Sequence, residues 1–172
     1  MTRLVRPDLR YHSSWAEAVR EFGDTAMHGS GLWEIDRGDL APATLERHVS
    51  GLLAAAADVP LDAEIVPCTY FWIVDEDDRF VGYLALRHRL NERLLEEGGH
   101  IGYAVRPTRR REGHATAALR LALDESRELG LDRVLVTCDQ DNDGSRRTIE
   151  TCGGVLEDQR GVKRRYWIDL TG

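Results

Sequence analysis

The sequence predicts a single α/β domain, residues 1–172, in which helices flank a mixed, twisted central sheet. A chain of 172 residues is long enough for one well-buried domain and short for two. Two apolar, aromatic-rich runs, 69–74 and 80–86, stand on either side of an acidic turn, as in a β-hairpin. Later, a buried-type strand at 134–138 follows a strand and a helix, which favours a right-handed parallel crossover. Antiparallel and parallel neighbours together predict the mixed sheet.

The first third of the chain predicts one strand and two helices. Residues 4–7 are typical of a short strand that ends at a proline. Apolar residues at helical spacing predict a helix that ends at Gly23 and a second helix over 44–57. The segment between them, 23–39, is rich in Gly, Asp and His and is predicted to be a loop.

Beyond the hairpin, the chain alternates between predicted strands and helices. The longest helix keeps its apolar residues on one face and is followed by Gly130, a residue suited to the position just past a helix. The elements predicted here are a short helical or irregular connection at 91–97, a strand at 100–106, a helix at 111–129, the strand at 134–138, a short helix at 145–152 and an antiparallel strand pair at 155–157 and 164–170.

Composition and charge indicate the partners that the protein does not favour. A hydrophobic share of 42% and a charged share of 31% are those of an ordinary globular protein. The formal net charge of -7 opposes general attraction to nucleic acid or anionic lipid. No apolar run reaches the length needed to cross a bilayer, and residues 1–20 are too polar for a signal peptide. We therefore expect a cytoplasmic protein with no nucleic-acid partner and no membrane partner.

The cysteines and the nucleotide motifs exclude further classes. Cys68, Cys138 and Cys152 form an odd set without the short spacing of a zinc site, so free thiols and no metal are expected. Neither a G-x-G-x-x-G motif nor a P-loop occurs, which argues against a dinucleotide oxidoreductase and against an NTPase.

A basic cluster stands out against the acidic background. Four arginines at positions 106, 109, 110 and 111 follow a predicted strand and precede Gly113 and a predicted helix. Glycine lets an anion approach the main chain, and the first N–H groups of a helix carry the positive end of its dipole. Arginines add forked, permanently charged donors that suit phosphate oxygens. This order of parts predicts an anion site, although charge alone also fits a solvated basic turn.

The run Arg110-Arg111-Glu112-Gly113-His114-Ala115 fits the pattern Arg/Gln, two residues, Gly, one residue, Gly/Ala at a strand-to-helix junction. It resembles the acetyl-CoA signature of the GNAT family of N-acetyltransferases. A Val-Arg-Pro strand exit, an alanine-rich helix and a downstream Asn-x-x-Ser accompany the signature. The resemblance covers about 70–170, the expected cofactor-binding core. Within it, 99–103 and 153–156 look most like a bacterial-type branch of the family.

The resemblance implies a GNAT-like fold and acetyl-CoA as cosubstrate. In this family the pantetheine arm lies like an extra strand between the motif strand and the next parallel strand. By match to the motif, the cofactor-binding residues are Tyr103, Ala104 and Val105 along the arm, Arg110, Arg111, Gly113, His114, Ala115 and Thr116 around the pyrophosphate, and Asn142, Ser145 and Arg146 farther along the arm.

Several of these residues also have a structural interpretation. Val105 and Ala115 could be packing positions, and Arg111 could be a solvated residue of the first helical turn. Asn142 could cap the helix that starts near Ser145, which is a common role for asparagine.

The chemistry of amine acylation needs a proton acceptor and favours a proton donor. An alkylamine with a pKa of about 10 is cationic at neutral pH and must lose a proton. Many family members carry Glu before the Ile-Gly-Tyr run, where His100 stands here; His100 or its competitor Glu97 could be the base. Many also carry a Tyr acid where this chain has Ile149. Either one of the other donors that the sequence offers, Tyr103, Tyr166 or Cys138, replaces it, or the thiolate, with a pKa of about 8.5, leaves without help.

The resulting hypothesis is an acetyl-CoA-dependent N-acetyltransferase that transfers the acyl group directly to a primary amine of unknown identity. The acceptor is a small molecule or a peptide, and the protein is a monomer or a homodimer. Because Ile149 cannot donate a proton, a non-catalytic acyl-CoA-binding or sensing module is the alternative. In the loop, acidic residues near Met27, His28 and Trp33 could form a wall for a cationic amine or could simply be solvated. These acidic residues are Asp24, Glu34, Asp36 and Asp39.

Overall fold

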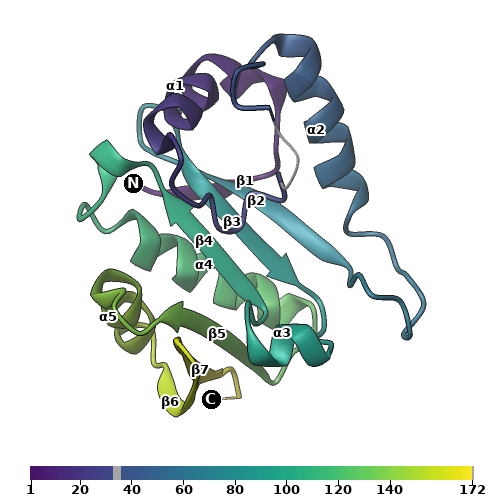
Figure 1. The fold of residues 1–172 in the computed structure, drawn as a ribbon, viewed down its shortest axis with the longest axis vertical. Helices are drawn as coiled ribbons and strands as arrows, with labels where there is room; N and C mark the ends of the chain where they lie inside the picture. The colour runs from purple at the N-terminus through teal and green to yellow at the C-terminus, as the bar shows by residue number, and fades with distance from the viewer. Residues whose placement is uncertain (33–35, 172) are drawn as a thin grey trace.

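A computed structural model of the chain describes residues 1–32 and 36–171. The predicted α/β fold is confirmed, and its strands form two sheets (Figure 1). The N-terminal sheet has the order β1-β2-β3-β4, and the C-terminal sheet has the order β5-β7-β6. The strands are β1 (Arg3–Val5), β2 (Cys68–Val74), β3 (Phe80–Arg87), β4 (Ile101–Val105), β5 (Arg133–Asp139), β6 (Val155–Arg160) and β7 (Lys163–Asp169).

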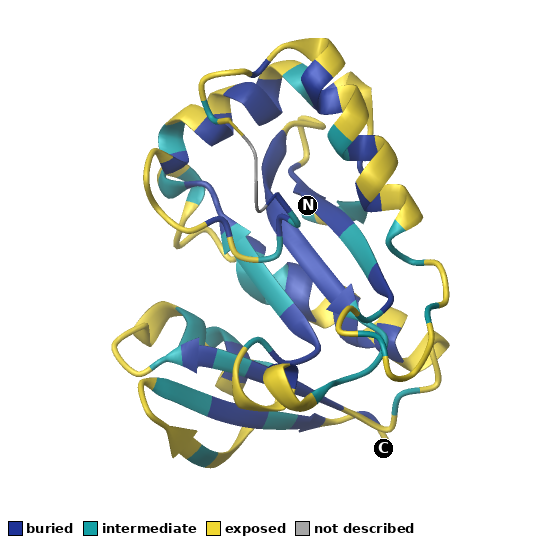
Figure 2. Cartoon of the chain, turned by 45° about the vertical axis from the view of Figure 1, so that its right-hand side comes forward, coloured by how far each residue is buried: buried dark blue, intermediate teal, exposed yellow. Residues whose placement is uncertain are grey.

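Helices cover both faces of the N-terminal sheet. On one face, α1 and α2 pack over aromatic side chains that include Trp72 and Tyr83, and α4 and α5 enclose the aliphatic core of the opposite face. Figure 2 shows the central strands of this sheet, β2 and β3, as largely buried. The helices are α1 (His12–Phe22), α2 (Pro42–Ala54), α3 (Glu92–Glu96), α4 (His114–Glu128) and α5 (Asp143–Thr151), with 3-10 turns at Leu9–Tyr11 and Pro107–Arg109.

Every hydrogen-bonded strand pair in the two sheets is antiparallel. The sequence predicts a parallel arrangement for β4 and β5, the two strands that α4 connects. They do run in the same general direction (Figure 1). These two strands belong to different sheets. The single sheet that the sequence predicts is therefore divided into two sheets, and the division lies between β4 and β5.

The predicted helix at 111–129 begins later than expected. Arg111 has a φ of 67° and Gly113 a φ of 86°, so neither residue is helical, and α4 starts at His114. Left-handed conformations at these positions turn the chain sharply between the 3-10 turn and the helix. The result is an irregular loop at 110–113 that presents its main chain beside the first turn of α4.

Candidate active site

β4 and β5 are neighbours that do not pair as strands. Each is the edge strand of its own sheet. The Arg106 N–H donates to Val81 O and the Arg87 N–H donates to His100 O, both at 2.8 Å, which fixes the β3–β4 ladder. In an antiparallel ladder every second residue directs its main-chain groups outward. The residues whose main-chain N–H and C=O groups face β5 are therefore Ile101, Tyr103 and Val105. We call the space between the unpaired edges of β4 and β5 the β4–β5 splay.

His100 and Leu135 close the splay at one end. The His100 N–H donates to Leu135 O at 2.7 Å, and the Leu135 N–H donates to His100 Nδ1 at 2.9 Å. The imidazole thus replaces the main-chain acceptor that a paired strand would supply. The His100 side chain is buried at this closed end of the splay.

Burial, with a smaller contribution from the Arg87 guanidinium, lowers the pKa of His100 to about 4. Its Nδ1 lone pair already accepts the Leu135 N–H, so protonation there would break this hydrogen bond. His100 is therefore better suited to joining the two sheets than to accepting a proton from an amine.

The arginine cluster divides into two structural residues and two available ones. Arg106 Nη2 pairs with Glu21 Oε1 at 2.7 Å, and its side chain is only 10% exposed. Arg109 Nη1 pairs with Asp75 Oδ2 at 2.5 Å, and its Nε pairs with Glu112 at 2.8 Å. These ion pairs tie the loop to α1 and to the β2–β3 hairpin, and they leave neither guanidinium free for a ligand.

The two carboxylates that hold the arginines have low pKa values. The Arg106 guanidinium, aided by Thr108, lowers the pKa of Glu21 to about 2. Burial acts to raise the pKa of Asp75, but hydrogen bonds from the Arg79 N–H and from Arg109 outweigh it and lower the pKa. Both carboxylates therefore stay ionised at neutral pH, and the loop anchors persist.

Arg110 and Arg111, the other two arginines of the cluster, are exposed. Within residues 1–32 and 36–171, neither has a carboxylate partner. Arg110 Nε donates to Val105 O at 3.1 Å, which holds its side chain at the open end of the splay. Arg111 is exposed in the loop that precedes α4.

The first turn of α4 presents main-chain N–H groups beside these arginines. A helix start leaves N–H groups without intrahelical acceptors, and here these belong to the residues after Gly113. A Cβ added to Gly113 would meet no atom within 4 Å, so the space beside this turn is open. The residues whose N–H groups can face an anion there are His114, Ala115 and Thr116.

The His114 side chain does not face this space. Its ring is buried, with Nδ1 at 2.9 Å from Thr2 Oγ1 and Nε2 at 3.2 Å from Arg109 Nη2. The imidazole points into the protein because it packs under the loop. Only the main chain of His114 is placed for an anion.

Ala104, Val105 and Ala115 also have packing roles. Val105 is a member of the core on the α4 side and Ala115 packs against it, whereas Ala104 packs against the core on the α1 side. Their possible contribution to a cofactor is therefore through the main chain. Thr116 is partly buried in the first turn of α4.

Tyr103 and Ser145 join the two sides of the splay on the α5 face. The Tyr103 hydroxyl lies 2.9 Å from Ser145 Oγ, so β4 and α5 share this hydrogen bond. Burial raises the pKa of Tyr103, and the phenol stays protonated at neutral pH. Ile149, four residues beyond Ser145, is fully buried in the core. The structure thus places a phenol, and not the side chain at 149, next to the splay.

Asn142 and Arg146 are occupied by the helix that carries Ser145. Asn142 Oδ1 accepts the Ser145 N–H at 3.0 Å, which is the capping interaction that the sequence also allowed. Arg146 pairs with Asp143 and with Glu150, both at 3.1 Å. These contacts give both residues a structural role at the start of α5.

Glu97, the other predicted base, keeps an exposed carboxylate. Lys163 Nζ lies 3.0 Å from Glu97 Oε1 and 2.6 Å from Asp139 Oδ1. The carboxylate is 65% exposed, so it remains open to solvent and to an incoming amine.

Two of the acidic residues predicted to form a wall for an amine instead accept hydrogen bonds within the loop and at the start of α2. Asp36 Oδ1 accepts a hydrogen bond from the Gly38 N–H. Asp39, which precedes α2, accepts a hydrogen bond at 2.6 Å from the hydroxyl of Thr44, which lies inside α2. Asp24 is exposed, while Trp33 and Glu34 lie outside the described residues. The two carboxylates with known partners serve the turn and the helix start.

None of the helices at 1–32 or 36–171 is both long and apolar enough to span a membrane. In the same ranges, no three side chains from His, Cys, Asp and Glu come together as a group that could hold a metal ion.

Solved structures with this fold include acetyltransferases that contain CoA derivatives. Microcin C7 self-immunity acetyltransferase MccE, in complex with acetyl-CoA and AMP, superposes with a TM-score of 0.68 at 15% identity, over 98% of this chain and 92% of that one. RimJ of Mycobacterium smegmatis, in complex with CoA-disulfide, gives 0.71 at 22% identity, over 98% and 81%. The ribosomal-protein-S5-alanine acetyltransferase of Vibrio fischeri gives 0.68 at 14% identity, over 98% and 91%.

The sequence itself identifies the family. No curated protein matches the chain. The model of the acetyltransferase (GNAT) domain matches residues 33–155, which is more than half of the chain and includes β4, the arginine loop, α4, β5 and α5. The protein therefore belongs to the GNAT family and is an acetyltransferase.

Proposed function

We propose that the protein binds acetyl-CoA in the β4–β5 splay and transfers the acetyl group directly to a primary amine. The observation that carries this proposal is the splay itself: two strand edges that do not pair, closed by His100 and Leu135. An extended amide-containing arm can bond to such an edge as an added strand does. Acetyl-CoA supplies an activated acyl thioester.

The pyrophosphate would be held where the splay opens. Arg110 and Arg111 provide the charged donors, and the first turn of α4 provides main-chain N–H groups and the positive end of the helix dipole. The residues that fit the cofactor are therefore fewer than the sequence motif implies, because Asn142 and Arg146 already have partners in α5.

The two proton-transfer steps are assigned to residues other than His100. We assign proton acceptance from the amine to Glu97, directly or through water, because its carboxylate is exposed whereas His100 is buried and bonded. We assign protonation of the leaving thiolate to Tyr103, whose hydroxyl is paired with Ser145 beside the splay. The first role rests on the exposure of Glu97, and the second rests on the position of Tyr103.

The test of the proposed function is release of free thiol from acetyl-CoA in the presence of a panel of primary amines. Calorimetry with CoA accompanies it, so that binding and turnover are measured separately. Amine-dependent thiol release is expected. CoA binding without thiol release for any amine would favour the non-catalytic acyl-CoA-binding module, and absence of both would remove the proposal.

Replacing Tyr103 with Phe should lower kcat by about a hundredfold or more, because it removes a general acid. CoA affinity should stay within about threefold, since the lost hydrogen bond to Ser145 contributes only about 1 kcal/mol net and the ring still packs. Tyr166→Phe is the matched control, as Tyr166 is the other phenol that the sequence offers. A loss of turnover in Tyr166→Phe alone would transfer the role to that residue.

A further inference from the structure

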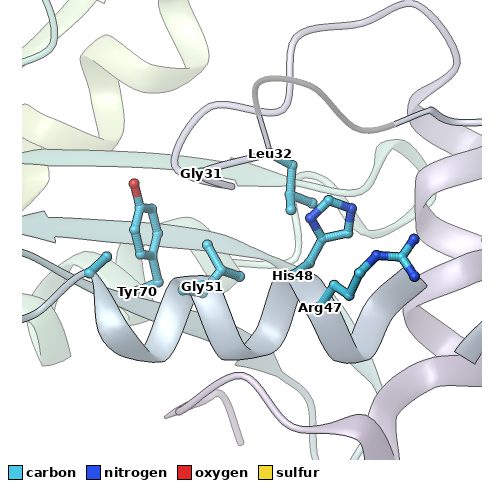
Figure 3. Close-up of a pocket in the computed structure, with 8 residues that line it drawn as sticks. Gly31, Leu32, Arg47, His48, Gly51 and Tyr70 are labelled. Carbon is cyan, nitrogen blue, oxygen red and sulfur yellow. The ribbon is translucent and has the colours of Figure 1, made fainter. Parts of the chain in front are cut away.

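A cavity of about 230 Å³ lies between α2, β2 and the segment Gly31–Leu32 (Figure 3). Its volume is somewhat below the range of about 300 to 1,000 Å³ that is usual for ligand pockets, which suits a small molecule. In Figure 3, Tyr70 stands at one end of the cavity and Arg47 lies at the other, with His48 between them and Leu32 above.

The loop before α2 separates this cavity from the β4–β5 splay. Tyr70, Ala85 and Gly102 are successive partners across β2, β3 and β4. Gly29 lies directly on the last two, because a Cβ added to it would collide with the Gly102 carbonyl and would touch the Ala85 main chain. Gly31 lies against Tyr70. The cavity is thus on the α2 side of the loop, away from the proposed acetyl-CoA site.

Arg47 is the charged side chain among the described residues that line the cavity. Arg47 Nη2 donates to Thr44 Oγ1 at 3.0 Å, and that hydroxyl donates to Asp39 at 2.6 Å, so the guanidinium is held at its end of the cavity. Burial, then the charge of Arg47, lowers the pKa of His48, whose ring is therefore neutral at pH 7. None of the described lining residues is acidic.

The floor of the cavity contains a glycine where a larger residue would fit. Gly51 lies inside α2, where glycine is less favourable than alanine by about 1 kcal/mol. A Cβ added there would meet no atom within 4 Å, so neither packing nor backbone conformation requires glycine. The apolar walls beside it are Leu32 and Leu52. The position keeps open a space that a side chain would otherwise fill.

We propose that this cavity is a second ligand site, distinct from the acetyl-CoA site, for a small organic anion with a compact apolar body, such as a carboxylate. The anionic group pairs with Arg47, whose planar fork matches carboxylate geometry. The apolar body fills the space above Gly51 between Leu32 and Leu52. Tyr70 limits its length. The site does not depend on the proposed transfer reaction.

The test measures binding of three probes of the same shape without any acyl donor: benzoate, benzyl alcohol and benzylamine. The readout is the His48 ring resonances, assigned with His48→Gln. Benzoate should bind at least about tenfold more tightly than the other two, as a charge-assisted hydrogen bond predicts. Arg47→Gln should abolish this preference, whereas Arg93→Gln, an exposed arginine on α3, should preserve it.

Gly51→Leu provides a variant that fills the cavity without unfolding the protein. It should eliminate binding of all three probes, raise the melting temperature through better helix propensity and leave CoA affinity unchanged. The proposal is overturned if benzoate has no preference, if the preference survives Arg47→Gln, if the probes still bind Gly51→Leu, or if none of them shifts His48.

Discussion

Gly113→Asp should weaken CoA binding by about 10- to 100-fold, as expected when one charge-assisted contact is lost and a like charge is added. Gly113 has a φ of 86° and open space around it, so an aspartate carboxylate would project beside the first turn of α4. There it would take the N–H groups that the pyrophosphate is proposed to use, and it would repel the phosphates. Calorimetry with CoA measures the effect.

Gly130→Asp is the matched control for this prediction. Gly130 follows the other end of α4, has a φ of 78° and also has no atom within 4 Å of an added Cβ. The backbone strain of a non-glycine residue is therefore similar at both positions. CoA affinity should be unchanged in Gly130→Asp. Equal losses in both variants would indicate a general effect on α4, and an unchanged affinity in Gly113→Asp would contradict the location of the site.

His100→Ala should destabilise the protein by about 2 to 4 kcal/mol at pH 8. It leaves the buried Leu135 N–H without an acceptor, which costs about 1 to 3 kcal/mol, and it opens a space beside Trp167. His100→Asn should recover much of this loss, because its side-chain oxygen can accept the same N–H. Chemical denaturation of the three proteins measures the differences.

The same residue predicts a pH dependence of stability. The folded pKa of His100, about 4, is below the unfolded value of about 6.5, so the unfolded chain binds the proton first as pH falls. The stability of the wild type that depends on His100 is therefore complete above pH 6.5 and decreases by about 3 kcal/mol as pH falls from about 6.5 to 4. His100→Asn should lack this decrease. An identical pH profile in both proteins would contradict the role of the neutral ring.

The turnover profile separates His100 from Glu97 as bases. With Glu97 as the acceptor, Glu97→Gln should lower kcat/KM by about a hundredfold and change its rising limb with pH, whereas His100→Asn should keep the limb. Loss of the limb only in His100→Asn would return the role to His100. An unchanged profile with full activity in both variants would leave water or the amine's own deprotonation as the route.

The order of strands and helices could be predicted from the sequence because its signals are local. Spacing of apolar residues identified α1 and α2, the acidic turn identified the β2–β3 hairpin, and Gly130 marked the end of α4. The start of α4 was misplaced by three residues, since a run of arginines does not reveal that Arg111 adopts a positive φ. The sequence therefore predicted which helices and strands occur better than it predicted the residue at which each one begins.

The candidate site was predictable as a motif but not as a set of contacts. The motif located Arg110, Arg111 and Gly113 at the start of α4, but the partners of the neighbouring arginines lie far along the chain: Glu21 is 85 positions from Arg106 and Asp75 is 34 from Arg109. No short pattern joins residues at such separations. For the same reason, the sequence did not show that His100 would bond to Leu135 or that the ring of His114 would point inward.

The ion pairs of Arg106 and Arg109 also make the molecule one cooperative unit. The cofactor motif belongs to the second half of the chain, yet its loop is fastened by Glu21 of α1 and Asp75 of the β2–β3 hairpin. Local opening of either element releases the loop, and a ligand that orders the loop opposes that opening. An anion bound before α4 therefore protects the N-terminal helix and hairpin from unfolding, although it touches neither.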